Sequence, residues 1–170
     1  MVIRLSQQMM KKLHHLTTMT AEPAAEPLCD WALHLFRHGH IHYILATNTR
    51  SLFSVVLLGR GITTGENLLT RLIPALREAH RGAGLEGAFE VSIAPHFDKV
   101  VWSKIGNRAV TGSMNEMIHH AKWILDEDDL GPLQLGDRIN NNILSLIGYQ
   151  KPAEAHREMA IVKSEATSSQ

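Results

Sequence analysis

A continuous apolar run from Leu52 to Leu58 constrains the fold more than any other segment of the chain. Its length suits a β-strand and is far too short for a helix that crosses a membrane. An apolar run without alternation is typical of a strand that is buried on both faces. We therefore expect residues 52–58 to form a central strand of a β-sheet.

Helical periodicity follows this strand. Residues 63–79 carry apolar side chains at helical spacing, and Thr63 and Glu66 have the spacing of a capping box. Pro74 lies inside the pattern, and because the apolar phase continues past it, we predict a kink rather than a break. Other patterns predict a helix over residues 6–13 and a last helix that opens at Pro152.

Apolar side chains at every second position indicate the remaining strands. In residues 31–47 it predicts a β-hairpin that turns near Gly39, with a short helix over 30–37 as the competing interpretation. Further strands are expected at 2–5, 89–93 and 100–102. These elements predict an α+β fold, in which about two or three helices pack on one face of a single mixed, largely antiparallel sheet of about five or six strands.

Size and composition limit the classes of function. The 170 residues fit one domain, which we assign to 1–160, followed by a disordered tail at 161–170. Lys plus Arg and Asp plus Glu both total 17, so strong non-specific binding to DNA is not expected. Cys29 is the only cysteine, which favours a reducing, cytoplasmic location. We expect neither a signal peptide nor a membrane partner.

The segment from Trp102 to Leu125 carries the strongest candidate site. It has the pattern of a strand, a polar turn and a helix, and Ser113 and Glu116 repeat the capping-box spacing. A helix that begins at Ser113 would offer free amide hydrogens and a partial positive charge to an anion. Gly112 would let the ligand approach the backbone closely.

A second polar turn, at Asn48 and Arg50, precedes the apolar strand, and the two turns would form one pocket if they share a sheet edge. We predict that this pocket binds a small anionic ligand, a nucleotide or a nucleic-acid segment. The side chains and turn glycine proposed to meet the ligand are Lys104, Asn107, Arg108, Gly112, Ser113, Asn115, Asn48 and Arg50. The alternative is a structural turn, in which Ser113 only caps the helix and Arg108 pairs with a surface carboxylate.

The run Asn107-Arg108-x-Val110-x-Gly112-Ser113-Met114-Asn115, with Lys104 before it, resembles the signature of a family of small uncharacterised bacterial proteins, a domain of unknown function. The strand and helix at 2–13, Trp31, and Thr47-Asn48 ahead of Leu52-Phe53 also resemble that family. The likeness covers about residues 1–125. Ala109 and Thr111 depart from the family pattern, in which a run like Ser-Val-Leu-Gly is expected. The resemblance implies a domain and a choice of site, and it implies no activity.

Histidines give a weaker signal for a metal. His38, His40 and His42 alternate, so they could ligate zinc from one face of a strand, but a glycine interrupts that strand. Glu116-x-x-His119 is half of a di-metal motif whose second copy is missing. We therefore predict no metal site and no cofactor, with the three alternating histidines as the alternative.

Three other patterns have structural explanations. The turn Gly59-x-Gly61-x-x-x-Gly65 lies between a strand and a helix, but its spacing departs from that of a dinucleotide-binding turn. Cys29 has no activating base near it in the sequence, so we expect a buried thiol. Asp126–Asp129 is expected to be a solvated loop, because adjacent carboxylates repel each other.

Three functions remain open. The preferred one is a cytoplasmic binding module. The first alternative is an enzyme that acts on the same ligand, with His119, His120 or Glu116 as its general base. The second alternative is a protein-interaction module, which an exposed apolar patch would favour. Proximity of the two polar turns would favour binding or catalysis, and the formation of homo-oligomers stays open.

Overall fold

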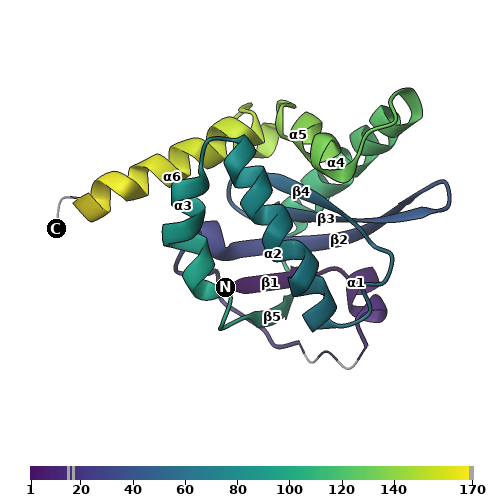
Figure 1. The fold of residues 1–170 in the computed structure, drawn as a ribbon, viewed down its shortest axis with the longest axis horizontal. Coiled ribbons are helices and arrows are strands. Elements are labelled where there is room, and N and C mark those ends of the chain that lie inside the picture. The colour runs from purple at the N-terminus through teal and green to yellow at the C-terminus, as the bar shows by residue number, and fades with distance from the viewer. Residues whose placement is uncertain (15, 17, 169–170) are drawn as a thin grey trace.

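One open five-stranded sheet forms the centre of the molecule in the computed structural model, which describes residues 1–14, 16 and 18–168. The strands are β1 (Val2–Leu5), β2 (Asp30–His38), β3 (Ile41–Asn48), β4 (Ser54–Leu58) and β5 (Val101–Lys104). Their order is β4-β3-β2-β1-β5 (Figure 1). β1 is parallel to β2 and β5, whereas β3 is antiparallel to β2 and β4. The mixed α+β fold is confirmed, although parallel and antiparallel pairings are equal in number.

The described residues form more helices than the two or three predicted. They are α1 (Gln7–Lys12), α2 (Gly65–Gly82), α3 (Glu86–Ala88), α4 (Arg108–Glu127), α5 (Pro132–Asn140) and α6 (Pro152–Ser168). Shorter 3₁₀ or π turns span Pro27–Cys29, Phe89–Ile93, Ala94–His96 and Ser145–Ile147. No helix within these residues has the length and apolar character needed to cross a membrane.

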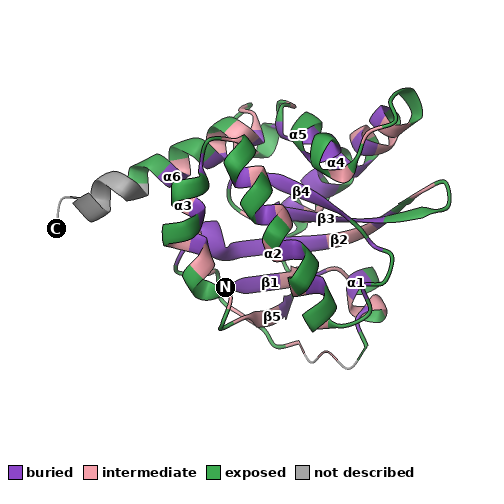
Figure 2. Ribbon diagram, in the orientation of Figure 1, coloured by how far each residue is buried: buried purple, intermediate pink, exposed green. Residues whose placement is uncertain are grey.

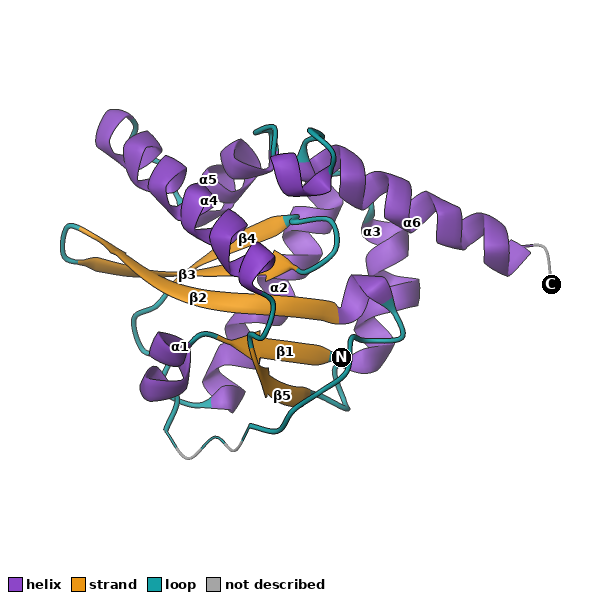
Figure 3. Cartoon of the chain, turned by 180° about the vertical axis from the view of Figure 1, so that it is seen from behind, coloured by secondary structure: helices purple, strands orange, loops and turns teal. Residues whose placement is uncertain are grey.

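Helices cover both faces of the sheet, so the prediction of a single covered face is wrong. α2 packs on one face (Figure 1), and α4 and α5 pack on the other (Figure 3). The cause is visible in β2, where Leu33 belongs to the first hydrophobic core while Ala32 and Phe36 belong to the second. Figure 2 shows the resulting arrangement, with buried strands between helices whose outer surfaces are exposed.

The predicted hairpin at residues 31–47 is confirmed, and the competing helix at 30–37 is wrong. β2 and β3 pair along their whole length, from Trp31 opposite Asn48 to His38 opposite Ile41. Gly39 forms the turn with a φ of 56°, a left-handed conformation that glycine adopts without strain.

The apolar run at 52–58 forms β4, which is an edge strand rather than the predicted central one. Ser54 to Leu57 are buried because α5 covers the open edge, while Leu58 at the end of the strand is exposed. The Asn140 side chain accepts a hydrogen bond from the Ser54 amide at 2.7 Å and donates one to the Ser54 carbonyl at 2.8 Å. The carboxamide thus takes the place of a neighbouring strand, which explains how an edge strand can be uniformly apolar.

Residues 89–93 form a π-helical turn, so the strand predicted there is wrong. Phe89 and Ile93 are fully buried, whereas Val91 is 74% exposed. Their spacing of four residues places the two buried side chains on the same side of a helical turn. The neighbouring prediction at 100–102 is confirmed as β5.

The predicted helices form with shifted ends. Ser6 caps α1 by accepting the Met9 amide, and α2 continues across Pro74. The cap of α2 is Thr64, which accepts the Asn67 amide, and not Thr63. α6 begins at Pro152 as predicted and continues to Ser168. Residues 169–170, the end of the predicted tail, lie outside the described residues.

Candidate functional site

Helix α4 begins at Arg108, five residues before the predicted start at Ser113. The Asn107 side chain caps it, since its Oδ1 accepts the Ala109 amide at 2.9 Å and the Val110 amide at 3.4 Å. Gly112 and Ser113 therefore lie inside the helix, and the amides predicted to bind an anion lie within it too. A Cβ atom at Gly112 would touch nothing within 4 Å, so no close approach requires this glycine.

The two polar turns nevertheless line one pocket, of about 500 Å³, which we call the turn pocket. Thr49 and Arg50 come from the turn between β3 and β4, while Gly106 and Asn107 come from the turn between β5 and α4. Arg4, Pro23, Asp30, Ile105 and Val110 complete the lining. The pocket joins segments that are far apart in the sequence, because α4 crosses the face of the sheet toward which Arg4 and Asp30 point.

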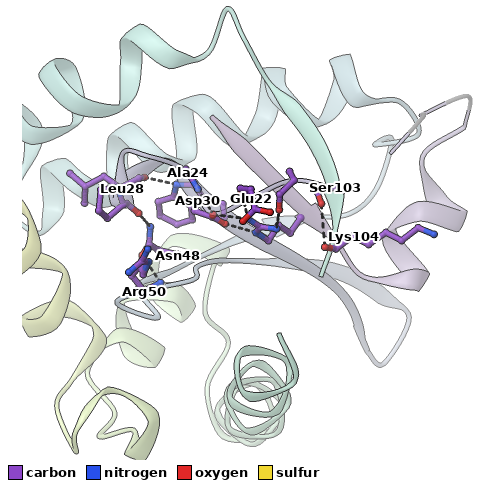
Figure 4. A network of polar contacts seen from close by, with 12 residues as sticks. Glu22, Ala24, Leu28, Asp30, Asn48, Arg50, Ser103 and Lys104 are labelled. Carbon is purple, nitrogen blue, oxygen red and sulfur yellow. Dashed lines mark hydrogen bonds and ion pairs between the residues drawn. The ribbon is translucent and has the colours of Figure 1, made fainter. Parts of the chain in front are cut away.

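The ion pair between Arg4 and Asp30 organises one side of this pocket (Figure 4). Arg4 donates to both carboxylate oxygens, at 2.7 and 2.9 Å, and its remaining bonds go to the carbonyls of Ala21 and Glu22. Asp30, which is 2% exposed, also accepts the Ala24 amide at 2.9 Å. The hydrogen bond to Asp30 raises the pKa of Arg4, so the ion pair holds the guanidinium in its charged form.

Asn48 is buried and holds the other turn in shape rather than facing a ligand. Its Nδ2 donates to the Pro27 carbonyl at 2.9 Å, and its Oδ1 accepts the amides of Arg50 and Ser51 at 3.1 Å (Figure 4). Leu52 in the same turn has a φ of 60°, a strained value for a branched side chain. These bonds fix the backbone from which the exposed Arg50 side chain projects.

The other predicted site residues do not line the turn pocket. Lys104 ends β5 with its side chain extended away from Arg50 (Figure 4), and Arg108 is exposed at the first turn of α4. Ser113 is buried against the core, and Asn115 lines a second pocket farther along α4. Of the eight predicted residues, the turn pocket brings together Arg50 and Asn107.

Sequence reasoning missed Arg4, Asp30 and Thr49. Arg4 is the one charged residue of β1. Asp30 is the first residue of β2 and is followed directly by the buried Trp31. Charges at such positions are a signal for a buried ion pair, because a strand inside a sheet holds a charge only when a partner is near.

The second pocket, of about 540 Å³, lies beside the outer half of β2, and we call it the histidine pocket. Its polar lining comes from β2, the hairpin, α1 and α4. These residues are His34, Arg37, His42, Asn115, His119, Lys122 and Gln8. Leu35, Phe36 and Ile118 supply the apolar part.

The three alternating histidines lie in different surroundings. His38 lies 3.5 Å from Asp126, His40 is exposed at the hairpin turn, and His42 lines the histidine pocket. Among residues 1–14, 16 and 18–168, no three His, Cys, Asp or Glu side chains are arranged to hold a metal ion. Zinc at these three histidines stays an untested alternative.

A buried polar cluster joins α2, α6 and the turn after β3, and no sequence pattern indicated it. The Nε2 atoms of His80 and His156 are 3.0 Å apart, and His156 Nδ1 lies 2.7 Å from the Ser51 hydroxyl. Burial lowers the pKa of His80, and burial together with the neighbouring His80 lowers the pKa of His156 well below its usual value. Ser51 is buried, so this serine–histidine pair offers no nucleophile to a substrate.

Cys29 is a structural thiol, as expected. It is buried, its Sγ donates to the Ser92 carbonyl at 3.1 Å, and burial raises its pKa to about 11. The thiolate that a nucleophile requires is therefore scarce at neutral pH.

Comparison with known proteins gives one match. A family model described as a domain of unknown function, DUF6933, matches residues 2–155. No curated protein and no solved structure matches the chain. The matched range contains the whole sheet and every residue that lines the two pockets.

Proposed function

We propose that this chain, which belongs to the DUF6933 family, is a binding module for a small anionic ligand. The ligand would occupy the turn pocket, with Arg50 as its main charged contact. We also propose that the protein is bacterial and cytoplasmic. The run from Asn107 to Asn115, which resembles a motif of bacterial proteins, and the single buried thiol of Cys29 support this assignment.

The observation that carries the proposal is the charge of the turn pocket. Its walls hold two cations, Arg4 and Arg50, and one anion, Asp30. Asp30 is neutralised by Arg4, while within the described part of the chain the Arg50 guanidinium has no polar partner. The pocket therefore has a formal charge of +1, located on a side chain that is free to bind a carboxylate or phosphate.

Neutral donors surround this charge. Because Asn107 uses its Oδ1 to cap α4, the Nδ2 hydrogens of its carboxamide are turned away from the helix. The Thr49 hydroxyl lies on the same lining as Arg50. A volume of about 500 Å³ is within the usual range for small-molecule sites. A phosphorylated or carboxylated metabolite, including a mononucleotide, fits this set of donors.

A pocket elsewhere provides a contrast. The groove between α2, α5 and α6 has a volume of about 430 Å³, but its lining holds three carboxylates, Glu78, Asp137 and Glu154, against one cation, Arg157. These carboxylates would repel an anion. The turn pocket is therefore the better candidate of the two for this class of ligand.

The proposal is limited to binding. Enzyme action would need a general base near the ligand, and the candidates predicted for that role were His119, His120 and Glu116. None of these belongs to the lining of the turn pocket. Asp30, the carboxylate that does line it, is already fixed by Arg4 and the Ala24 amide.

Calorimetric titration with inorganic phosphate, citrate and AMP tests the proposal on wild type and Arg50→Ala. A charge-assisted hydrogen bond contributes about 1.5–3 kcal/mol, so we expect affinity to fall by about 10- to 100-fold in the variant. Arg60→Ala is the matched control, since Arg60 is exposed and lines none of the described pockets. No saturable binding by wild type, or equal losses in both variants, would refute the site.

A protein-interaction module is the second candidate, because the segment between α5 and α6 exposes large apolar side chains. Ile143 is 64% exposed and Tyr149 is 77% exposed, and Leu146 lies between them in the sequence. Light scattering of wild type and an Ile143→Ser, Tyr149→Ser variant tests self-association. A mass above that of a monomer, lost in the variant, would favour this candidate.

A further inference from the structure

The lining of the histidine pocket has an unusual charge balance for a protein whose formal net charge is zero. Arg37 and Lys122 are permanently charged, three imidazoles share the walls with them, and no Asp or Glu belongs to the lining. The nearest acidic residues along α4, Glu116 and Asp126, lie outside it, and Asp126 faces His38. The pocket therefore concentrates positive charge and hydrogen-bond donors without a balancing carboxylate.

These groups are also available to a ligand. Within the described residues, the side chains of Lys122, His119 and His42 have no hydrogen-bond or ion-pair partner. Arg37 donates its Nε to the Gly39 carbonyl at 2.7 Å, which fixes the side chain and leaves both terminal nitrogens uncommitted. A cluster of like charges without partners is unfavourable by itself, so an anion would stabilise it.

The spacing of the donors selects among anions. The imidazoles of His34, His42 and His119 line one pocket but do not converge on a point where a metal ion could sit. Donors spread over the walls of a pocket of about 540 Å³ suit an extended anion better than a single ion. Two adjacent charged groups on one ligand could contact Lys122 and Arg37 together.

We infer that the histidine pocket is a second anion site, which binds a small molecule that carries two or more linked phosphoryl groups. Lys122 and Arg37 supply charge, and His119, His42 and Asn115 supply hydrogen bonds to phosphoryl oxygens. This site shares no residue with the turn pocket, so a test of one site can succeed or fail without affecting the other.

Titration with inorganic pyrophosphate, followed by the ring C–H signals of the histidines in NMR spectra, tests this site. We expect saturable shifts of the signals of His34, His42 and His119, assigned by His→Gln variants, and none for His96. Lys122→Gln should weaken binding by about 10-fold or more, because it removes a charged hydrogen bond. Lys122→Arg should retain most of the affinity if charge at this position is what matters.

Two controls separate the outcomes. Lys99→Gln removes an exposed positive charge that lies outside the pocket, and it should leave pyrophosphate binding unchanged. Arg50→Ala should also leave it unchanged, although we expect this variant to weaken binding at the turn pocket. Shifts that never saturate, equal weakening by Lys99→Gln and Lys122→Gln, or binding of a single-stranded oligonucleotide without binding of pyrophosphate would each overturn the inference.

Discussion

The Nε2 atoms of His80 and His156 lie 3.0 Å apart in the core, which fixes the protons on both rings. His80 Nδ1 faces the Leu76 carbonyl at 2.7 Å, so it must donate, and His80 Nε2 must accept in the neutral ring. His156 therefore donates from Nε2 and accepts a hydrogen bond at Nδ1 from the Ser51 hydroxyl, 2.7 Å away, so the single hydroxyl proton is directed to His156 rather than to Asn48 Oδ1 at 3.1 Å. Two neutral imidazoles satisfy the contacts of both rings, whereas two charged ones would place N–H against N–H.

We predict from this pair that the free energy of unfolding falls as the pH drops below the ordinary histidine pKa of about 6.5. Burial lowers the pKa of both rings in the folded state, so the unfolded chain binds more protons in acid. The stabilisation is complete above the unfolded pKa and is lost as the pH falls toward the folded values. Urea denaturation at a series of pH values between about 5 and 8 measures this slope.

A variant isolates the contribution of the pair. His156→Phe leaves the buried His80 Nε2 without its partner, while the Ser51 hydroxyl can still donate to Asn48 Oδ1, so the variant should lower stability at neutral pH by about 1–3 kcal/mol. Because the variant lacks one of the two histidines with a lowered pKa, its free energy of unfolding should fall less steeply as the pH drops. His40→Gln, at the exposed hairpin turn, should keep the wild-type slope. An unchanged slope in His156→Phe would contradict the assignment.

The pair between Arg4 and Asp30 should contribute strongly to stability. Arg4→Met leaves the buried Asp30 carboxylate without a counter-charge, and breaking a buried pair in this way lowers stability by about 3–5 kcal/mol. Adding Asp30→Leu should recover part of the loss. In Arg81→Met, which breaks an exposed pair, urea denaturation should show little change. A small effect of Arg4→Met would show that water reaches Asp30.

Asn140 should stabilise the edge of the sheet. Asn140→Ala removes both bonds to the Ser54 backbone, and we expect a loss of about 1–3 kcal/mol in urea denaturation. The freed edge of β4 should also promote association, measurable by light scattering, because uncovered strand edges pair with other chains. Asn141→Ala, one residue further along, removes only an exposed bond to the Asp137 carbonyl and should change neither property.

Gly112 should behave as an ordinary residue of a helix interior. Gly112→Ala adds a methyl group that meets nothing within 4 Å, and alanine favours a helix over glycine by about 0.5–1 kcal/mol. We therefore expect a higher melting temperature. Gly39→Ala should lower it, since the φ of 56° disfavours any Cβ. Destabilisation by Gly112→Ala would indicate that this glycine serves a turn after all.

The success of sequence reasoning depended on whether one local signal was decisive. Gly39 between two alternating runs favoured the hairpin over the competing helix at 30–37, because a glycine turn joins two such runs directly. Asn107 and Ser113 are both good helix caps, and nothing local decides between them, so the start of α4 was misplaced. The apolar run at 52–58 indicated burial correctly, but burial on both faces does not distinguish a central strand from an edge covered by α5.

The candidate site was predictable only at residues that lie in turns recognisable from the local sequence. Arg50 and Asn107 follow strands in polar turns, which is a pattern that sequence displays, and the structure brings them into one pocket. Arg4 and Asp30 meet because β1 and β2 pair in parallel, and His80 meets His156 because α6 packs back onto α2. Such contacts depend on tertiary packing, so a charge such as Arg4 in a strand indicates that a partner is needed but does not identify which residue supplies it.

The interior place of β1 in the sheet has a consequence for synthesis of the protein. β1 is synthesised before the other four strands, yet its outer neighbour is β5, where Val2 pairs with Val101. At about 5–20 residues per second, the nascent chain carries β1 for about 5–20 s before that partner has been made. During this interval one side of β1 is open to other chains, so a chaperone that shields this strand should raise the yield of folded protein.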